Sequence, residues 1–292
     1  MGLVSAAAVL MGGAAWADQP VDRGVDFQSP ATPAMQEIVS FHNFLLPIIT
    51  VISVFVLALL LWVIIRYNRR ANPTPRKFTH NMLVEVVWTV LPVLILVAIA
   101  WRSFPILYHQ ERAPPAELTI KVIGNSWFWN YEYEDMGLTV TSNRLPEADA
   151  RAQGRPNLLA VDNPIYVPVG ENVRLLITSN DVIHSWTIPA FGVKQDAIPG
   201  RVNMGWFNVE RPGTYYGQCS ELCGVNHAFM PIEVRAVPRA EFERWVAAQG
   251  GTLASADTPD AATPTEGQPV EGQPAEETTT PSGAAAGNAP AR

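Results

Sequence analysis

The stretch Phe44–Ile65, FLLPIITVISVFVLALLLWVII, contains no charged side chain. A helix of this length crosses about 30 Å, which is the thickness of the hydrocarbon core of a bilayer. The stretch therefore predicts a membrane-spanning helix and decides the fold class of the chain. A second apolar stretch, Met82–Trp101, carries a single carboxylate, Glu85, and predicts a second span.

The segment between the two apolar stretches sets their orientation. It reads RYNRRANPTPRKFTH and contains five cations, Arg66, Arg69, Arg70, Arg76 and Lys77. Because short basic loops stay on the cytoplasmic side of a membrane, we expect a helical hairpin over residues 44–104 with a cytoplasmic loop at 67–81. Both termini then lie on the opposite side.

A third, shorter apolar segment begins the chain. MGLVSAAAVLMGGAAWADQ ends in the small-residue pattern Ala15-Trp16-Ala17 and is too short to span a bilayer. We predict a signal peptide at residues 1–17, followed by a periplasmic segment at 18–43. The segment departs from the usual signal in one respect, because no Lys or Arg precedes its apolar part.

The composition changes after residue 105. Short β-branched runs such as LTIKVIG, IYVPV and NVRLLIT are separated by Gly, Pro, Asn and Asp, which predicts an all-β sandwich or barrel over residues 105–251. RAEFERWVAAQ, at 239–249, predicts one amphipathic helix. Residues 252–292 are rich in Ala, Thr, Pro and Glu and lack aromatic side chains, so we predict a disordered tail.

Overall charge and cysteine content exclude two classes of protein. The net charge is −7, and the sequence contains no basic run long enough to bind a phosphate backbone, so nucleic acid is not an expected partner. Two cysteines in 292 residues do not make a disulfide framework.

Both cysteines lie in QCSELCGVNHAFMP, residues 218–231, together with His227 and Met230. Another histidine, His184, lies upstream in NDVIHSWTIP. Thiolate, imidazole and thioether form a soft donor set that selects copper over hard ions. A mononuclear blue-copper site takes one thiolate, whereas Cys219 and Cys223 together can bridge a pair of copper ions. We interpret the motif as a binuclear copper site.

Two other interpretations of these residues stay open. In an oxidising compartment Cys219 and Cys223 can form a disulfide or a thiol-exchange pair, and the chain would then be a membrane-tethered copper-delivery protein or thiol oxidoreductase. Zinc can take two Cys and two His, but it leaves Met230 without a role.

Longer motifs make the chain similar to subunit II of haem–copper cytochrome c oxidases of the aa3 type. The similarity covers about Phe44 to Trp245 and rests on the hairpin and on WFWNYEY, VIHSWTIPAFGVKQDAIPGR and GTYYGQCSELCGVNHAFMPIEV. It implies a cupredoxin-like domain that lies, with both termini, on the periplasmic side of a bacterial inner membrane. Two related families are alternatives. The complete ligand set argues against a quinol oxidase subunit II, which has lost copper, and the hairpin argues against the copper domain of a nitrous oxide reductase.

The resemblance also implies a role for each residue of the motif. Cys219 and Cys223 match the bridging thiolates of the binuclear centre CuA, and His184 and His227 match its terminal imidazoles. Met230 matches the weak axial ligand. Glu221 matches a residue that gives its backbone carbonyl to copper and its carboxylate to a magnesium or manganese ion at the interface with subunit I.

In this family, cytochrome c reduces CuA, which passes electrons to haem a of subunit I, where oxygen is reduced to water and protons are pumped. The haems belong to subunit I. The implied partners are therefore subunit I, subunit III, cytochrome c and membrane lipid.

Trp127 matches the aromatic residue through which electrons enter the family's copper centre. From the strand pattern alone it is a core residue, because Trp127, Trp129, Tyr131 and Tyr133 alternate onto one face. Many relatives have His-Gln before this Trp, whereas this chain has Asn125-Ser126. The difference puts the local hydrogen bonding in doubt.

Four carboxylates complete the predicted sites. Glu132, Asp162 and Asp181 match residues that face cytochrome c, and together they would attract a basic partner. Glu85 matches a position at the mouth of a proton pathway into subunit I. An ionisable residue inside a span is a functional candidate, although Glu85 lies close enough to the cytoplasmic end to extend to the interface instead.

Overall fold

The computed structural model describes residues 16–253. The predicted signal peptide therefore lies outside the described residues except for its last two positions, and the predicted tail lies outside them except for its first two. Both stay predictions.

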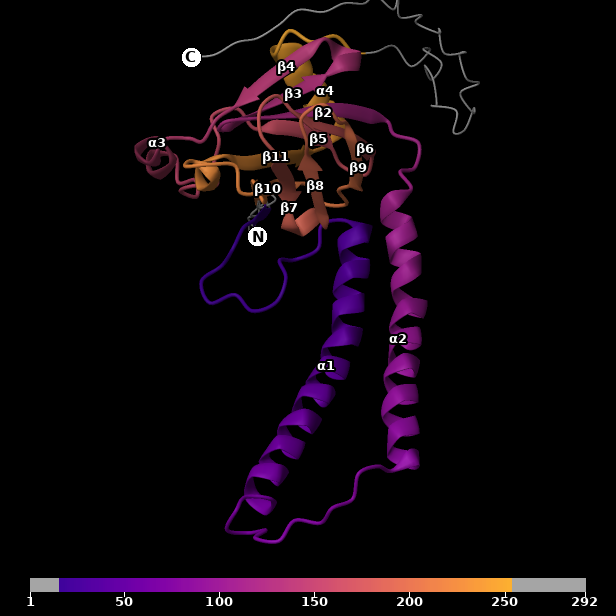
Figure 1. The fold of residues 1–292 in the computed structure, drawn as a ribbon. Coiled ribbons are helices and arrows are strands. Elements are labelled where there is room, and N and C mark those ends of the chain that lie inside the picture. The colour runs from indigo at the N-terminus through magenta and orange to yellow at the C-terminus, as the bar shows by residue number, and fades with distance from the viewer. Residues whose placement is uncertain (1–15, 254–292) are drawn as a thin grey trace, which may run out of the picture. The chain divides into compact units, whose positions relative to one another are not determined.

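Two long helices, α1 (Pro33–Arg66) and α2 (Met82–Glu111), form a hairpin (Figure 1). Each contains one of the predicted spans, and their most apolar windows have mean hydropathies of 3.2 and 2.6 with no buried residue. Apolar side chains that no core covers require lipid or another protein around them. Both helices extend beyond the predicted spans, and α2 continues past residue 104, where the sequence placed the end of the hairpin.

Polar side chains cap the start of each long helix. The hydroxyl of Thr32 accepts a hydrogen bond from the amide of Met35, and the side chain of Asn81 accepts one from the amide of Val84. Glu85 completes the second cap, because its Oε1 accepts a hydrogen bond from the Asn81 amide at 3.2 Å. Such caps satisfy amides that have no partner within the helix.

The rest of the described chain is mainly β-structure. The larger sheet has the strand order β4-β3-β2-β6-β9, with β2 Leu118–Asn125, β3 Phe128–Tyr133, β4 Leu138–Ser142, β6 Asn172–Ser179 and β9 Asn203–Asn208. The other has the order β1-β10-β11-β5, with β1 Trp16–Asp18, β5 Ile165–Pro168, β10 Gly213–Gln218 and β11 Pro231–Val237. β7 (His184–Ile188) and β8 (Val193–Ala197) form a separate antiparallel pair.

One hydrophobic core joins the two sheets. Alternate residues of β6 are buried, as are Trp129, Tyr131 and Tyr133 of β3. Ile232 and Val234 of β11 contribute to the same core from the other sheet. This inward–outward alternation is that of a β-sandwich, so the predicted all-β domain is confirmed.

Short helices close the domain. α3 spans Glu147–Ala152, and 3-10 turns occupy Glu134–Met136, Pro189–Phe191 and His227–Phe229. The helix predicted at 239–249 is α4, Arg239–Ala248, which buries Phe242 and Val246 in the core.

The start of α1 and the end of α2 are both hydrogen-bonded to the β-domain. The Thr32 hydroxyl donates to the Phe191 carbonyl at 2.7 Å, next to the start of α1. Near the end of α2, the indole of Trp206 on β9 donates to the Gln110 carbonyl at 3.0 Å. These two hydrogen bonds join the ends of the hairpin helices to the sandwich.

Strand β10 passes so close to β7 that it requires glycine at one position. A Cβ on Gly217 would lie 1.9 Å from the carbonyl oxygen of Thr187, so Gly217→Ala forces the two strands apart. We expect the free energy of unfolding to fall by about 1–3 kcal/mol, measured by chemical denaturation. Gly205→Ala on β9 is the control, because its Cβ would meet no atom closer than 3.9 Å. Equal stability of the two variants would contradict the close approach.

Candidate metal centre

The end of β10 and the start of β7 bring the two parts of the donor set together. His184 is the first residue of β7, and Cys219 directly follows β10. The amide of Ser220 donates to the carbonyl of Ser185 at 2.9 Å, which fixes the cysteine loop against β7. Residues far apart in the sequence thus form one buried cluster.

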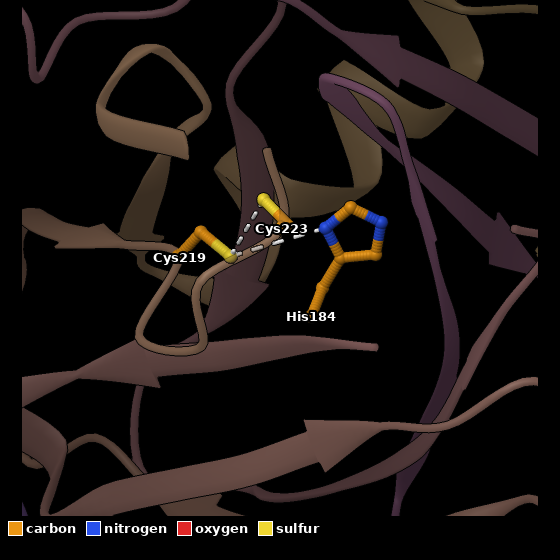
Figure 2. A group of neighbouring side chains, drawn as sticks. All are labelled: His184, Cys219 and Cys223. Atoms are coloured by element: carbon orange, nitrogen blue, oxygen red, sulfur yellow. Dashed lines mark hydrogen bonds between the residues drawn. The ribbon is translucent and has the colours of Figure 1, made fainter. Parts of the chain in front are cut away.

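Figure 2 shows the centre of this cluster, in which His184, Cys219 and Cys223 face one another. The two sulfur atoms are 3.8 Å apart, and Nδ1 of His184 lies 3.9 Å from Sγ of Cys219. Nδ1 of His227 lies 3.6 Å from Sγ of Cys223, and Sδ of Met230 lies 3.5 Å from the same sulfur. The structure therefore brings together all five predicted side-chain donors.

These distances and donor types suit a soft metal. Cys219 and Cys223 are free thiols, since a disulfide requires sulfur atoms about 2.05 Å apart. Thiolate–metal bonds of about 2.3 Å allow two sulfurs at the observed spacing to share one ion. Met230 is buried, with its thioether at the cluster, and this placement favours copper over zinc.

The environment of the two thiols makes them unequal. Burial by itself would raise the pKa of Cys219, but hydrogen bonds from His184 and from the Ser185 and Glu221 backbone outweigh it and lower this pKa to about 7. Burial and the neighbouring Cys219 raise the pKa of Cys223 to about 12. Cys219 is therefore the thiol that loses its proton first, as a metal ligand must.

His184 is held from behind by two features. A Cβ on Gly124 would lie 2.8 Å from Cδ2 of the imidazole, so this glycine makes room for the ring. Nε2 of the ring lies 2.8 Å from Oδ1 of Asp181, which leaves Nδ1 directed at Cys219. A carboxylate on the far nitrogen fixes the tautomer and the orientation of a metal-binding histidine.

Asp181 extends this contact to the predicted electron-uptake residue. Its Oδ2 accepts a hydrogen bond from the amide of Ser126 at 2.7 Å, and Ser126 precedes Trp127. The indole Nε1 of Trp127 donates to the carbonyl of Cys223 at 3.1 Å. Trp127 lies before β3, is half-buried and packs beside the metal loop. Trp127 is therefore not a strand residue of β3, but it packs against the edge of the core as well as against the metal loop, so its roles in packing and in electron uptake both stay open.

Sequence reasoning assigned Asp181 to partner docking and did not identify its contact with His184. The three-residue spacing in NDVIHSW was the available signal, but it specifies no contact between these side chains in a loop. Gly124 was missed for a similar reason, because it lies on a different strand from the histidine.

The other predicted carboxylates have different surroundings. Glu132 pairs with Lys121 at 2.8 Å on the neighbouring strand. Asp162 is exposed and accepts hydrogen bonds from the backbone of adjacent asparagines. The carbonyl of Glu221 lies 3.4 Å from Sγ of Cys219, whereas its side chain is exposed. Glu85 lies on α2 and takes part in the cap described above.

Comparisons with known proteins cover both halves of the chain. Residues 20–106 match the family model of the cytochrome c oxidase subunit II transmembrane domain, and residues 118–237 match that of the periplasmic domain. The chain is 46% identical over 254 residues to a probable cytochrome c oxidase subunit 2 of Rickettsia bellii, which covers 87% of this chain and 94% of the relative.

A more distant relative agrees with these matches, and one solved structure is also similar in sequence to part of the chain. The cytochrome c oxidase subunit 2 of Cereibacter sphaeroides is 42% identical over 252 residues, covering 80% of this chain and 83% of the relative. The crystal structure of the periplasmic domain of subunit II of cytochrome oxidase from Bradyrhizobium japonicum is 46% identical. It covers 48% of this chain and 97% of that one, with a TM-score of 0.44.

Asp181→Ala tests the contact behind His184. Without the carboxylate, the imidazole loses the partner that orients it, and we expect copper affinity to fall by about 10- to 100-fold. Competition with a chelator measures the change. Asp181→Asn, which keeps an acceptor, should lose less, and Asp162→Ala should resemble the wild type because its carboxylate does not contact the cluster. Wild-type affinity in Asp181→Ala would remove this residue from the site.

Proposed function

The chain belongs to the cytochrome c oxidase subunit II family, and we propose that within such an oxidase it is the subunit that receives electrons from cytochrome c. It is a two-span membrane protein that assembles with other oxidase subunits. The observation that carries the proposal is the convergence of two thiols, two imidazoles and one thioether on a single buried point.

In this proposal the five side chains hold a binuclear copper centre, CuA. Cys219, Cys223, His184 and His227 would hold the copper, with Met230 and the Glu221 carbonyl as further donors. Copper bound there would supply one-electron redox chemistry, with haem a of subunit I as the proposed acceptor. The chain contributes a rigid, dry donor set, because both cysteines, His184 and Met230 are buried.

Trp127 is the proposed place where electrons enter the subunit. Together with Arg144, Asn226 and Phe229 it lines a hollow of about 350 Å³, so part of its ring is accessible to a partner. Its indole nitrogen contacts the carbonyl of Cys223. One side chain thus connects the surface with a metal ligand, which is the geometry that electron uptake requires.

Glu132, Asp162 and Asp181 are the carboxylates proposed to face cytochrome c. Their charges would speed the encounter with a basic partner more than they would strengthen the complex. Lys121 offsets much of the charge of Glu132, and His184 engages Asp181. Asp162 pairs with no cationic or histidine side chain among the described residues, so we assign it the largest share of the long-range attraction of cytochrome c.

The metal loop also supports a contact with subunit I. Leu222 and Val225 are 78% and 85% exposed beside the cluster, and large apolar side chains in such positions favour a protein partner. We propose that this loop faces subunit I, with the Glu221 carboxylate on a magnesium or manganese ion at the interface. Subunit III and membrane lipid are the remaining proposed partners.

Glu85 is proposed to stand at the mouth of a proton pathway into subunit I. It is half-exposed at the cytoplasmic end of α2. Its contact with the Asn81 amide orients the carboxylate and also stabilises the helix start, so a substitution there affects both properties.

We further propose that the chain resides in a bacterial inner membrane. Both termini and the β-domain would lie in the periplasm, because the basic loop at 67–81 is retained in the cytoplasm. A signal peptide at 1–17, a periplasmic segment at 18–43 and a tail from 252 complete the proposed organisation.

Cysteine substitutions test the copper assignment. Full-length protein, purified in detergent and loaded with copper, should bind a pair of ions and show an electron paramagnetic resonance signal from one electron shared between them. Cys219→Ser or Cys223→Ser should abolish the shared signal, because an alcohol does not replace a bridging thiolate. Substitution of Ser220, which lies between β10 and Cys223 and is no ligand, is the control. A full-strength shared signal in either cysteine variant would contradict bridging.

Trp127→Phe tests electron uptake separately from stability. Phenylalanine keeps much of the apolar bulk but lacks the N–H that contacts Cys223. We expect copper content and melting temperature to stay near the wild-type values, while electron transfer from bound cytochrome c, measured by stopped flow, falls at least about tenfold, equivalent to about 1.4 kcal/mol of activation free energy. Phe229→Leu, in the same hollow, should slow transfer less. A normal transfer rate together with lost stability would assign Trp127 a packing role.

A further inference from the structure

A second hollow lies on the β-domain, away from the cluster of cysteines and histidines and sharing no lining residue with it. It has a volume of about 460 Å³ and lies between β4, β5, β11 and α4, which Figure 1 labels. Its wall is mostly polar and comprises Thr139, Thr141, Arg155, Asn163, Arg235 and Gln249 together with Tyr166 and Trp245. Its volume is in the range of small-molecule sites.

The charged groups at the base of this hollow do not balance. Glu233 is 1% exposed, and its carboxylate is shared between two guanidinium groups. Arg155 donates to Oε2 of Glu233, and Arg235 donates to Oε1 through Nε and Nη2, at 3.2 Å each. Two cations and one anion leave an excess positive charge at the base.

Asp162 also lines the hollow, but its carboxylate is already engaged. Oδ1 accepts hydrogen bonds from the amides of Asn143 and Asn163, and Oδ2 accepts one from the side chain of Asn143. Its negative charge offsets the excess at the base, so a ligand in this hollow is recognised through the unused guanidinium N–H groups next to Glu233 and not through net charge.

Both guanidinium groups have unused donors. Arg235 uses three of its five N–H groups, two on Glu233 and one on the Tyr166 hydroxyl at 3.0 Å. Nε of Arg155 is buried and has no hydrogen-bond partner within residues 16–253. Since this Nε is shielded from solvent, the donors that a ligand in the hollow can reach are the unused terminal N–H groups of the two guanidiniums, whose side chains are 16% (Arg155) and 34% (Arg235) exposed.

An aromatic surface forms another part of the wall. The rings of Tyr166 and Trp245 stack with centroids 4.8 Å apart and planes 20° from parallel. Arg235 lies over the Tyr166 ring at 5.7 Å. Tyr166 is covered by these two contacts, so Trp245, which is half-buried and lines the hollow, is the ring that another planar group can contact.

We propose that this hollow binds a small organic anion. Its carboxylate or phosphate group contacts Arg155 and Arg235, and its planar ring lies against Trp245. Arginine is suited to such an oxyanion because its planar fork matches two acceptor oxygens.

Phenyl phosphate is a suitable probe because it combines an oxyanion with a ring. We would titrate it into the full-length, copper-loaded protein in detergent at low ionic strength, where charges are least screened, and follow the heat of binding. Inorganic phosphate provides the anion without the ring, and phenol the ring without the anion. Saturable binding is expected for phenyl phosphate, weaker binding for inorganic phosphate, and none for phenol.

Variants locate the binding. Arg235→Gln, which leaves Glu233 paired with Arg155, should weaken phenyl phosphate at least about tenfold. Arg244→Gln is the matched control, since Arg244 is exposed on α4 and does not line the hollow. Trp245→Leu should weaken phenyl phosphate several-fold and leave inorganic phosphate unchanged. If Arg235→Gln does not fold, Arg235→Lys decides, because it keeps the charge and loses the fork, and it should still bind more weakly.

Several results would overturn the proposal. The first is that phenyl phosphate shows no saturable binding up to about 10 mM, a concentration at which any specific site would be occupied. The second is that Arg235→Gln and Arg244→Gln bind phenyl phosphate with equal affinity. The third is that phenyl phosphate and inorganic phosphate bind equally well and Trp245→Leu has no effect on either. The copper signal of the same samples reports on the proposed function independently, since the two sites share no lining residue.

Discussion

The bond from the Ser220 amide to the Ser185 carbonyl joins the two parts of the chain that supply metal donors. On one side lies β7, which begins at His184, and on the other lies the loop that carries Cys219 and Cys223. Gly217 lets β10 approach β7 closely and so allows this bond to form, since a Cβ there would lie 1.9 Å from the Thr187 carbonyl oxygen. A packed sandwich has few ways to move, so this approach fixes the separation of imidazole and thiol within narrow limits. The proposed electron chemistry depends on this rigidity, because a site that hardly moves costs little to oxidise or reduce.

A second constraint connects this site to the molecular surface. Asp181 contacts both His184 and the amide of Ser126, and the neighbouring Trp127 contacts the Cys223 carbonyl. The Asn125-Ser126 pair, where many relatives have His-Gln, therefore still allows Asp181 and Trp127 to make these contacts with the metal site. The Ser126 contact uses a backbone N–H group, which almost any residue at this position provides. The side chain of Asn125 contributes a separate bond with Asn180.

The hairpin and the sandwich have different physical requirements but are held together by specific bonds. The spans need an apolar environment because their side chains are uncovered in the described part of the chain. The sandwich supplies its own core. Thr32 and Trp206 join the two through hydrogen bonds to the backbone carbonyls of Phe191 and Gln110.

The sequence by itself determined the features that depend on local pattern. Uninterrupted apolar length predicted the two helices, β-branched runs predicted a sandwich or barrel, and the motif from Cys219 to Met230, taken together with His184 upstream, predicted the donor set. Tertiary structure decided what depends on contacts between distant residues. It placed Trp127 between the metal loop and the edge of the core, directed Asp181 to His184, and assembled Arg155, Glu233 and Arg235 from different segments. Side-chain alternation along one strand cannot reveal these arrangements, because each is set by the way strands far apart in the sequence pack against one another.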